Sequence, residues 1–209
     1  MRKTLLVCLP MVAMIGCSSP VLDVPEGTTL PEATALWDSH YQSAVTVDDG
    51  FYKKIISHYA GTDLAKQARL DVMKLSLSHK DSKEFKHHYE QFKRVYSSAA
   101  DRLEAEKIYA DWAMSFYQNR LEQVLSIDTH RDVQFLLDAY HQLSALRSEL
   151  PQKSQRIELV KKLDEIQSIM ERETVKHIRH ERQLGHDKTA QKLEKQLKKW
   201  FPKTQALNV

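Results

Sequence analysis

The chain is poor in cysteine, and its two cysteines, Cys8 and Cys17, both lie within the first 17 of 209 residues. From Ser18 onward the sequence therefore has no thiol that could act as a nucleophile or metal ligand, and it cannot form a disulfide. A domain built from these residues must be stabilised by its hydrophobic core alone. The hydrophobic content of 42% is ordinary for a protein that folds in this way.

Glycine and proline are also scarce, with only 5 and 6 residues, and they fall at boundaries. Gly50, Gly61 and Gly185 lie at predicted turns, and Pro151 and Pro202 at predicted helix ends. Neither type interrupts residues 101–150 or 152–184, as long helices require. The only candidate strand, at 45–47, is too short and runs directly into Asp-Asp-Gly. The sequence therefore predicts an all-α fold.

A large excess of charge is missing as well. The formal net charge is +3, and loss of Arg2 and Lys3 with a signal segment would leave 29 Lys and Arg against 28 Asp and Glu. Nucleic-acid-binding surfaces are usually strongly basic, so this near balance argues against nucleic acid as the main partner.

Signatures of catalysis are missing too: there is no Gly-rich phosphate loop, no Gly-x-Ser-x-Gly and no zinc-protease helix. The nearest approach to a metal site is Glu173, His177 and Glu181, which would share one side of a helix, with His180 next to Glu181. Basic residues are interleaved with them, which favours a solvated, salt-bridged face. We therefore predict no enzyme, no catalytic or cofactor-binding residue and no metal.

The N-terminus carries the most specific motif. A positive start, Arg2-Lys3, precedes an apolar run at 5–15 that suits an export signal and is too short to span a membrane. The run ends in Met14-Ile15-Gly16-Cys17, which resembles a bacterial lipobox. The resemblance implies cleavage before Cys17, lipidation of Cys17 and, because Ser18 follows, sorting to the outer membrane. The alternative is an ordinary secretory signal with an incidental cysteine.

These boundaries predict a lipoprotein signal peptide at 1–16, a lipidated Cys17 with a flexible tether to residue 30, and a helical domain at 31–209. Pro20, Pro25 and Gly27 argue against a helix in the tether. Its 13 residues from Ser18 to Leu30 would reach roughly 40 Å when fully extended. Pro31 would occupy the first position of the first helix.

The helical domain is organised around a predicted pair of helices between Thr62 and Tyr96. The first helix carries small and β-branched residues on one face and larger aliphatic residues on the adjoining face: Ala65, Ala68, Val72 and Leu75, then Leu70, Met73 and Leu77. The second carries an aromatic stripe with helical spacing, formed by Phe85, Tyr89, Phe92 and Tyr96. Asp81 or Ser82 can cap the second helix.

The ending of this pair recurs along the chain. The stretches 55–61 and 197–203 have the layout of 92–98, and Tyr140 and Leu143 ahead of Leu150-Pro151 form a further copy with altered spacing. Separations of this kind fit helix-turn-helix repeats of variable length. Chance similarity among amphipathic helices is the alternative.

The stretch 59–70, Tyr-Ala-Gly-Thr-Asp-Leu-Ala-Lys-Gln-Ala-Arg-Leu, resembles the repeats of BamD-type outer-membrane lipoproteins. The order near the C-terminus is also similar, with a repeat ending at Leu150-Pro151, a long helix, Gly185 in a turn and then Phe201-Pro202. The resemblance implies antiparallel helix-turn-helix repeats in a TPR-like (tetratricopeptide-like) α-solenoid.

The same resemblance implies a function. The protein would be a non-enzymatic scaffold on the periplasmic face of the outer membrane, with β-barrel assembly components as partners. The alternative is a pilotin-type TPR lipoprotein that escorts secretin or pilus subunits.

The aromatic residues have two interpretations in such a solenoid. Most of the larger rings are predicted to pack between repeats: Trp37, Phe85, Phe92, Trp112, Phe116 and Trp200. Tyr89, Tyr109 and Tyr117 are candidates for an exposed groove, because a hydroxyl group tolerates water. Sequence alone does not separate groove from core, so it assigns no binding residue.

Overall fold

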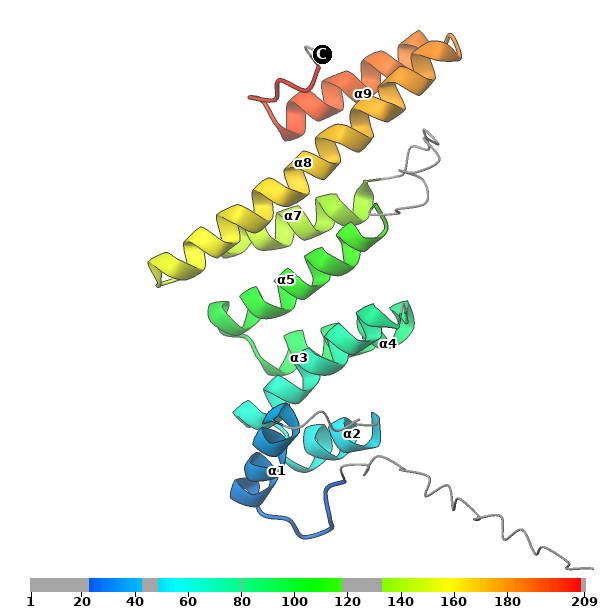
Figure 1. The fold of residues 1–209 in the computed structure, drawn as a ribbon. Coiled ribbons are helices and arrows are strands. Elements are labelled where there is room, and N and C mark those ends of the chain that lie inside the picture. Colours follow the sequence, from blue (N-terminus) through cyan, green and yellow to red (C-terminus); the bar gives the residue numbers. More distant parts are fainter. Residues whose placement is uncertain (1–22, 43–48, 80, 118–132, 208–209) are drawn as a thin grey trace, which may run out of the picture.

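The computed structural model describes residues 23–42, 49–79, 81–117 and 133–207. Within these ranges the regular structure is α-helical and no strand occurs, which confirms the all-α prediction (Figure 1). Residues 1–22, including Cys17, and the run 45–47 lie outside the described ranges. The helices in chain order are α1 (Leu30–Gln42), α2 (Asp49–His58), α3 (Asp63–Ser78), α4 (Ser82–Val95), α5 (Ala99–Ser115), α7 (Gln134–Leu146), α8 (Lys153–Gln183) and α9 (Asp187–Trp200).

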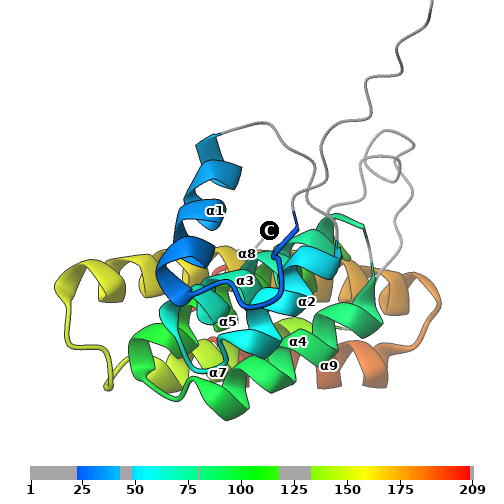
Figure 2. The same ribbon diagram turned by 90° about the horizontal axis from the view of Figure 1, so that it is seen from below.

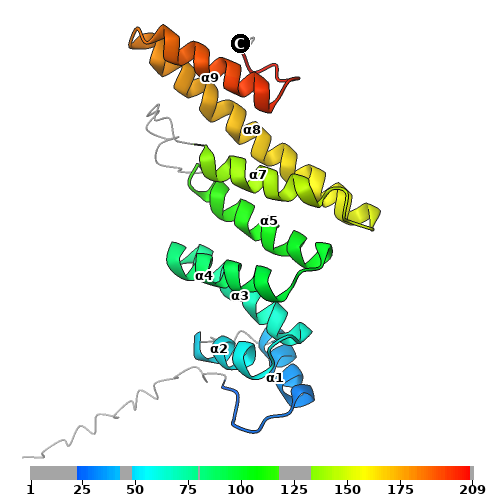
Figure 3. The ribbon, with the colours of Figure 1, turned by 180° about the vertical axis from the view of Figure 1, so that it is seen from behind.

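The helices stack in an elongated array, with α1 and α2 at one end and α8 and α9 at the other (Figure 1, Figure 3). Most contacts join neighbours in the chain, such as α2 with α3, α3 with α4 and α8 with α9. Helix α5 has the most neighbours, since it packs against α3, α4, α7 and α8. Seen from below, α1 runs across the direction of α8 and α9 (Figure 2).

Helix α3 is shared by two hydrophobic cores. Its small and β-branched face, including Ala68 and Val72, joins an N-terminal core with Trp37, Phe51 and Ile55. Its aliphatic face, with Leu70 and Met73, joins the main core that α4, α5, α7, α8 and α9 build. The two faces predicted for this helix are confirmed, and each serves a different core.

Local sequence signals place the helix starts. The Thr62 side chain accepts a hydrogen bond from the backbone N–H of Ala65 at the start of α3. Asp81 caps α4 by accepting from the N–H groups of Lys83 and Glu84 at 3.1 and 3.0 Å, as predicted. Gly61 precedes Thr62 with φ +82°, a conformation that glycine adopts without steric strain.

The segment before α1 differs from the prediction. The tether was expected to be free as far as residue 30, but Val24 is buried in the N-terminal core. Lys54 pairs with Asp23 at 2.6 Å, and the Tyr59 hydroxyl donates to the carbonyl of Thr28. Residues 23–29 therefore pack against the domain. Helix α1 begins at Leu30, where the N–H and hydroxyl of Thr29 both donate to Glu32, and the N–H bond is one of the two bonds of a capping box.

Other differences concern single residues. Gly50, predicted at a turn, lies in the first turn of α2, whereas Gly61 and Gly185 occupy turns with positive φ. Val160, predicted on the apolar face of α8, is 38% exposed. The long helix itself is confirmed, and it turns back through Gly185 into α9, with Arg182 paired to Glu194 across the hairpin.

Candidate interaction site

A continuous column of aromatic rings runs through the junction of α4, α5 and α7. Its members touch through ring–ring contacts with centroids 4.8 to 6.4 Å apart, within the range of favourable aromatic pairs. The column comprises Phe85 and Tyr89 on α4, Tyr109 and Trp112 on α5, Phe116 just after α5, and Phe135 on α7. It begins buried at Tyr89 and reaches the surface at Phe116 and Phe135.

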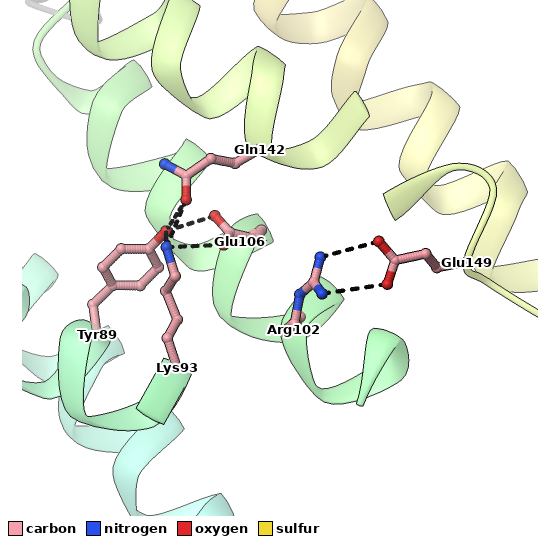
Figure 4. Close-up of polar contacts among 6 residues, drawn as sticks. All are labelled: Tyr89, Lys93, Arg102, Glu106, Gln142 and Glu149. Carbon is pink, nitrogen blue, oxygen red and sulfur yellow. Dashed lines mark hydrogen bonds and ion pairs between the residues drawn. The ribbon is translucent and has the colours of Figure 1, made fainter. Parts of the chain in front are cut away.

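The buried end of the column carries a polar network drawn from three helices (Figure 4). The Tyr89 phenol oxygen lies 2.7 Å from Glu106 Oε2 and 2.6 Å from Gln142 Oε1. Lys93 Nζ donates to Gln142 at 2.8 Å and to the Tyr89 oxygen at 3.2 Å, and it lies 3.8 Å from Glu106 Oε1. Its ammonium also stands 4.7 Å from the centre of the Tyr89 ring. The network therefore ties α4 to α5 and α7.

Burial dominates the electrostatics of this network. It raises the pKa of the Glu106 carboxyl, against the opposing effects of the Tyr89 hydroxyl and Lys93. It also raises the pKa of the Tyr89 phenol well above its usual range, and that of Tyr109 to about 12. A phenol has one proton, so Tyr89 donates to only one of the two acceptor oxygens at a time, and Lys93 donates to the Tyr89 and Gln142 oxygens.

Replacing Glu106 by glutamine should change the pH dependence of stability. As the pH rises, the unfolded chain loses its Glu106 proton first, near a pKa of about 4.3, and ionisation then favours the unfolded state. Glutamine keeps a donor for Tyr89 without that penalty. Compared with wild type, Glu106→Gln should therefore gain free energy of unfolding between about pH 4 and about pH 8, measured by urea melts.

The exposed Glu104 on the same helix offers a matched control, Glu104→Gln. A difference in free energy of unfolding between wild type and Glu106→Gln that stays the same at both pH values would contradict a raised pKa of Glu106 in the folded state.

A second ion pair fixes the same helices further along. Arg102 on α5 donates to Glu149, which follows α7, through both terminal nitrogens at 3.3 and 3.5 Å (Figure 4). This pair is more exposed than the Tyr89 network. It therefore contributes mainly to the orientation of α5 relative to the end of α7.

The surface end of the column, which we call the aromatic end, consists of Trp112, Phe116, Phe135 and Lys86. Phe116 is 37% and Phe135 42% exposed, so Phe116 is the exposed member of the set of rings of which most were predicted to be packed. Lys86 Nζ lies 5.4 Å from the centre of the Trp112 ring and 5.6 Å from that of Phe135. Both distances are typical of cation–π contacts.

The tyrosines proposed for an exposed groove are in fact buried. Tyr89, Tyr109 and Tyr117 are each less than a tenth exposed, and Tyr89 satisfies its hydroxyl within the protein. The larger rings Trp37, Phe85, Phe92 and Trp112 are buried as predicted, and Trp200 is partly buried. The hydroxyl group was thus a poor guide to exposure, because Glu106 and Gln142 replace water as its partners.

The polar residues considered for a metal do not come together as one site in the described part of the chain. Glu173 is buried and pairs with Arg172 and Lys176, contrary to the solvated face predicted for it. Glu181 lies within ion-pair distance of His177 Nε2, at 3.5 Å, and of His186 Nδ1, at 3.0 Å. Within the described ranges no group of three or more His, Cys, Asp or Glu side chains could hold a metal ion. His180 joins no such group either.

Three site residues, Glu106, Gln142 and Lys86, were not predicted from the sequence. Glu106 and Gln142 look like solvent-facing polar residues on helices. A signal was present for Glu106, because Tyr109, Ala110 and Ala113 lie on the same helix face. An apolar face indicates burial, so a glutamate on that face is expected to be buried with it. Lys86 gave no signal at all.

A surface depression lies between α5 and the N-terminal half of α8, apart from the aromatic end. Its volume is about 790 Å³, and Met114, Ile157, Val160 and Ile169 contribute its apolar surface. Lys162 also lines the depression, and its ammonium pairs with Asp111 at 3.0 Å and Glu165 at 2.7 Å. The positive charge of Lys162 is therefore already neutralised within the protein.

Comparisons with protein-family profiles, with curated proteins and with solved structures found no match. Of the helices in the described ranges, none combines the length and apolar character needed to cross a bilayer.

Proposed function

We propose that this protein is a non-enzymatic, lipid-anchored scaffold of TPR-like helical repeats that assists the assembly of β-barrel proteins at the periplasmic face of the outer membrane. The proposal joins the lipobox at Cys17 and the BamD-like stretch at 59–70 to the open helical array. The observation that carries it is a helix ending that recurs in three places.

The three endings share features at matched sequence positions. In each, an aromatic residue directly follows the helix, and its backbone N–H donates to the carbonyl oxygen of the residue four positions earlier. The pairs are Tyr59 with Ile55 at 3.1 Å, Tyr96 with Phe92 at 2.9 Å and Phe201 with Leu197 at 2.9 Å. Each acceptor residue is fully buried. The backbone bond itself is common to helix ends, as at His79 and Leu184. What recurs is an aromatic residue directly after the helix, four positions beyond a fully buried apolar residue, and this recurrence supports a repeat architecture.

The architecture suits a scaffold. Stacked repeats contact mainly their neighbours and leave long faces available to other proteins. Here α5 and α7 expose the aromatic end, an apolar surface of the kind found at protein interfaces.

Crosslinking in intact cells followed by purification from membranes tests the proposed partners. Recovery of β-barrel assembly components, identified by mass spectrometry, is the expected result. Recovery of a secretin or pilus subunits without them would replace the proposal by the pilotin-type function.

The anchor has its own test. Cys17→Ser removes the only thiol that the lipobox places at the cleavage site, so the variant should lose its acyl chains and remain uncleaved or become soluble. Acylation with two or more chains gives stable membrane attachment, and its loss should be visible by fractionation and by mass spectrometry of the N-terminus. Cys8→Ser is the matched control and should fractionate as wild type. Unchanged outer-membrane fractionation of Cys17→Ser would refute lipidation as the anchor.

A further inference from the structure

We propose that the aromatic end is a docking surface for a segment of a partner protein in which a large apolar side chain stands beside a carboxylate. The inference rests on the proposed scaffold function only in taking the partner to be a protein. It does not depend on which assembly machinery that partner belongs to.

The apolar half of the surface is formed by clustered rings. The exposed rings of Phe116 and Phe135 lie 5.9 Å apart and are nearly stacked, and both contact the buried Trp112 at 5.0 and 5.3 Å. Isolated exposed apolar residues are common, but adjoining exposed rings supported by a buried tryptophan form a pre-ordered apolar surface. Such surfaces suit the aromatic or aliphatic anchors that dominate binding energy at protein interfaces.

The charged half is defined by a contrast between two lysines on α4. Lys93 stands over the Tyr89 ring, and its charge is met by Glu106 from α5 and by the Gln142 oxygen from α7. Lys86, two turns earlier on the same helix, stands over the Trp112 and Phe135 rings in a similar way. Among the described residues, however, no carboxylate lies within ion-pair distance of Lys86.

The two lysines thus differ in one respect: Lys93 has both a ring and an acidic residue beside it, whereas Lys86 has only rings among the described residues. A carboxylate supplied by another molecule would complete the same set of groups, a lysine between a ring face and an acid. The adjoining rings of Phe116 and Phe135 would receive the apolar side chain next to that carboxylate. Charge complementarity therefore selects an acidic, aromatic segment over a basic one. In the depression between α5 and α8, by contrast, Lys162 is already paired with Asp111 and Glu165.

Peptide binding tests the inference with the full chain in detergent. The probe is a fluorescent peptide in which Phe alternates with Glu, compared with peptides in which Phe alternates with Lys and Ser alternates with Glu. We expect measurable binding of the first peptide only, by fluorescence anisotropy. Both Phe135→Ala and Lys86→Glu should weaken it by about tenfold or more, as truncation of interface anchors does.

Two variants control for general effects. Lys83→Glu reverses a charge on the same helix at a lysine that, among the described residues, makes no cation–π contact, and Ile157→Ala removes an apolar side chain on α8 that is 61% exposed. Both should bind the peptide within about twofold of wild type, as for surface positions outside a contact. Circular dichroism melts of all four variants separate loss of binding from loss of folding.

Several results would overturn the inference. Equal binding of the Lys-containing peptide, equal effects of Lys86→Glu and Lys83→Glu, or no binding of the Phe–Glu peptide would each do so. Self-association that Phe135→Ala abolishes would assign the surface to a second copy of the chain. Binding to anionic phospholipid vesicles that Phe135→Ala abolishes would assign it to a membrane. None of these results depends on recovering β-barrel assembly components, so failure here is distinguishable from failure of the proposed function.

Discussion

Replacing Phe92 by alanine should lower the free energy of unfolding by roughly 3–5 kcal/mol, the range observed when a buried phenylalanine is truncated. The Phe92 ring is fully buried in the main core and lies 4.8 Å from the ring of Tyr96. Its removal leaves a cavity between α4 and the helices packed against it. This loss is a large share of the 5–15 kcal/mol that typically stabilises a folded protein.

Urea melts and hydrogen exchange measure the effect and its extent. Because the main core is continuous from α3 to α9, protection should fall on both sides of residue 92. Phe135→Ala is the matched control, since Phe135 is exposed and loses mainly ring contacts worth about 1 kcal/mol. An unchanged melting midpoint for Phe92→Ala would contradict its place in the core.

A second large effect is expected at Phe51, but it should stay local. Phe51 is fully buried in the N-terminal core and stacks on Trp37 at 6.0 Å. Phe51→Ala should remove roughly 3–5 kcal/mol from that core. Because α3 is the helix that contributes to both cores in the part of the chain that the structure describes, we expect loss of protection in α1 and α2 while α7 and α8 remain protected.

Site-resolved hydrogen exchange distinguishes this result from global unfolding. Tyr52→Phe is a suitable control, because it removes a hydroxyl that contacts His40 and keeps the ring in place. If protection in α7 and α8 falls as far as in α1 and α2, the two cores form one cooperative unit and the prediction is wrong.

The sequence predicted much of the fold because its signals were local. The two faces of α3, the cap at Asp81 and the turn at Gly185 depend on residues within a few positions of one another. Helical periodicity carries that information directly. The burial of Phe92 followed from the same periodicity, since the residues at 85, 89 and 92 repeat with helical spacing.

The candidate site could not be predicted in the same way, because it depends on contacts between distant residues. The sequence made Tyr89 a candidate for an exposed groove, yet its hydroxyl hydrogen-bonds to Gln142, which is 53 residues away in the sequence. The exposure of Phe116 depends on where α7 places Phe135 beside it. No spacing rule within one helix reports either arrangement.

The burial of Val24 sets a limit on where the molecule can stand relative to a membrane. With a lipid on Cys17, six peptide steps separate the membrane anchor from Asp23, whose side chain is paired with Lys54. Fully extended, those steps span roughly 20 Å, which is about half the reach predicted for a flexible tether from Ser18 to Leu30. The α1–α2 end would therefore be held close to the lipid headgroups. The α8–α9 hairpin, at the opposite end of the array, would be the part able to extend furthest from the bilayer (Figure 1).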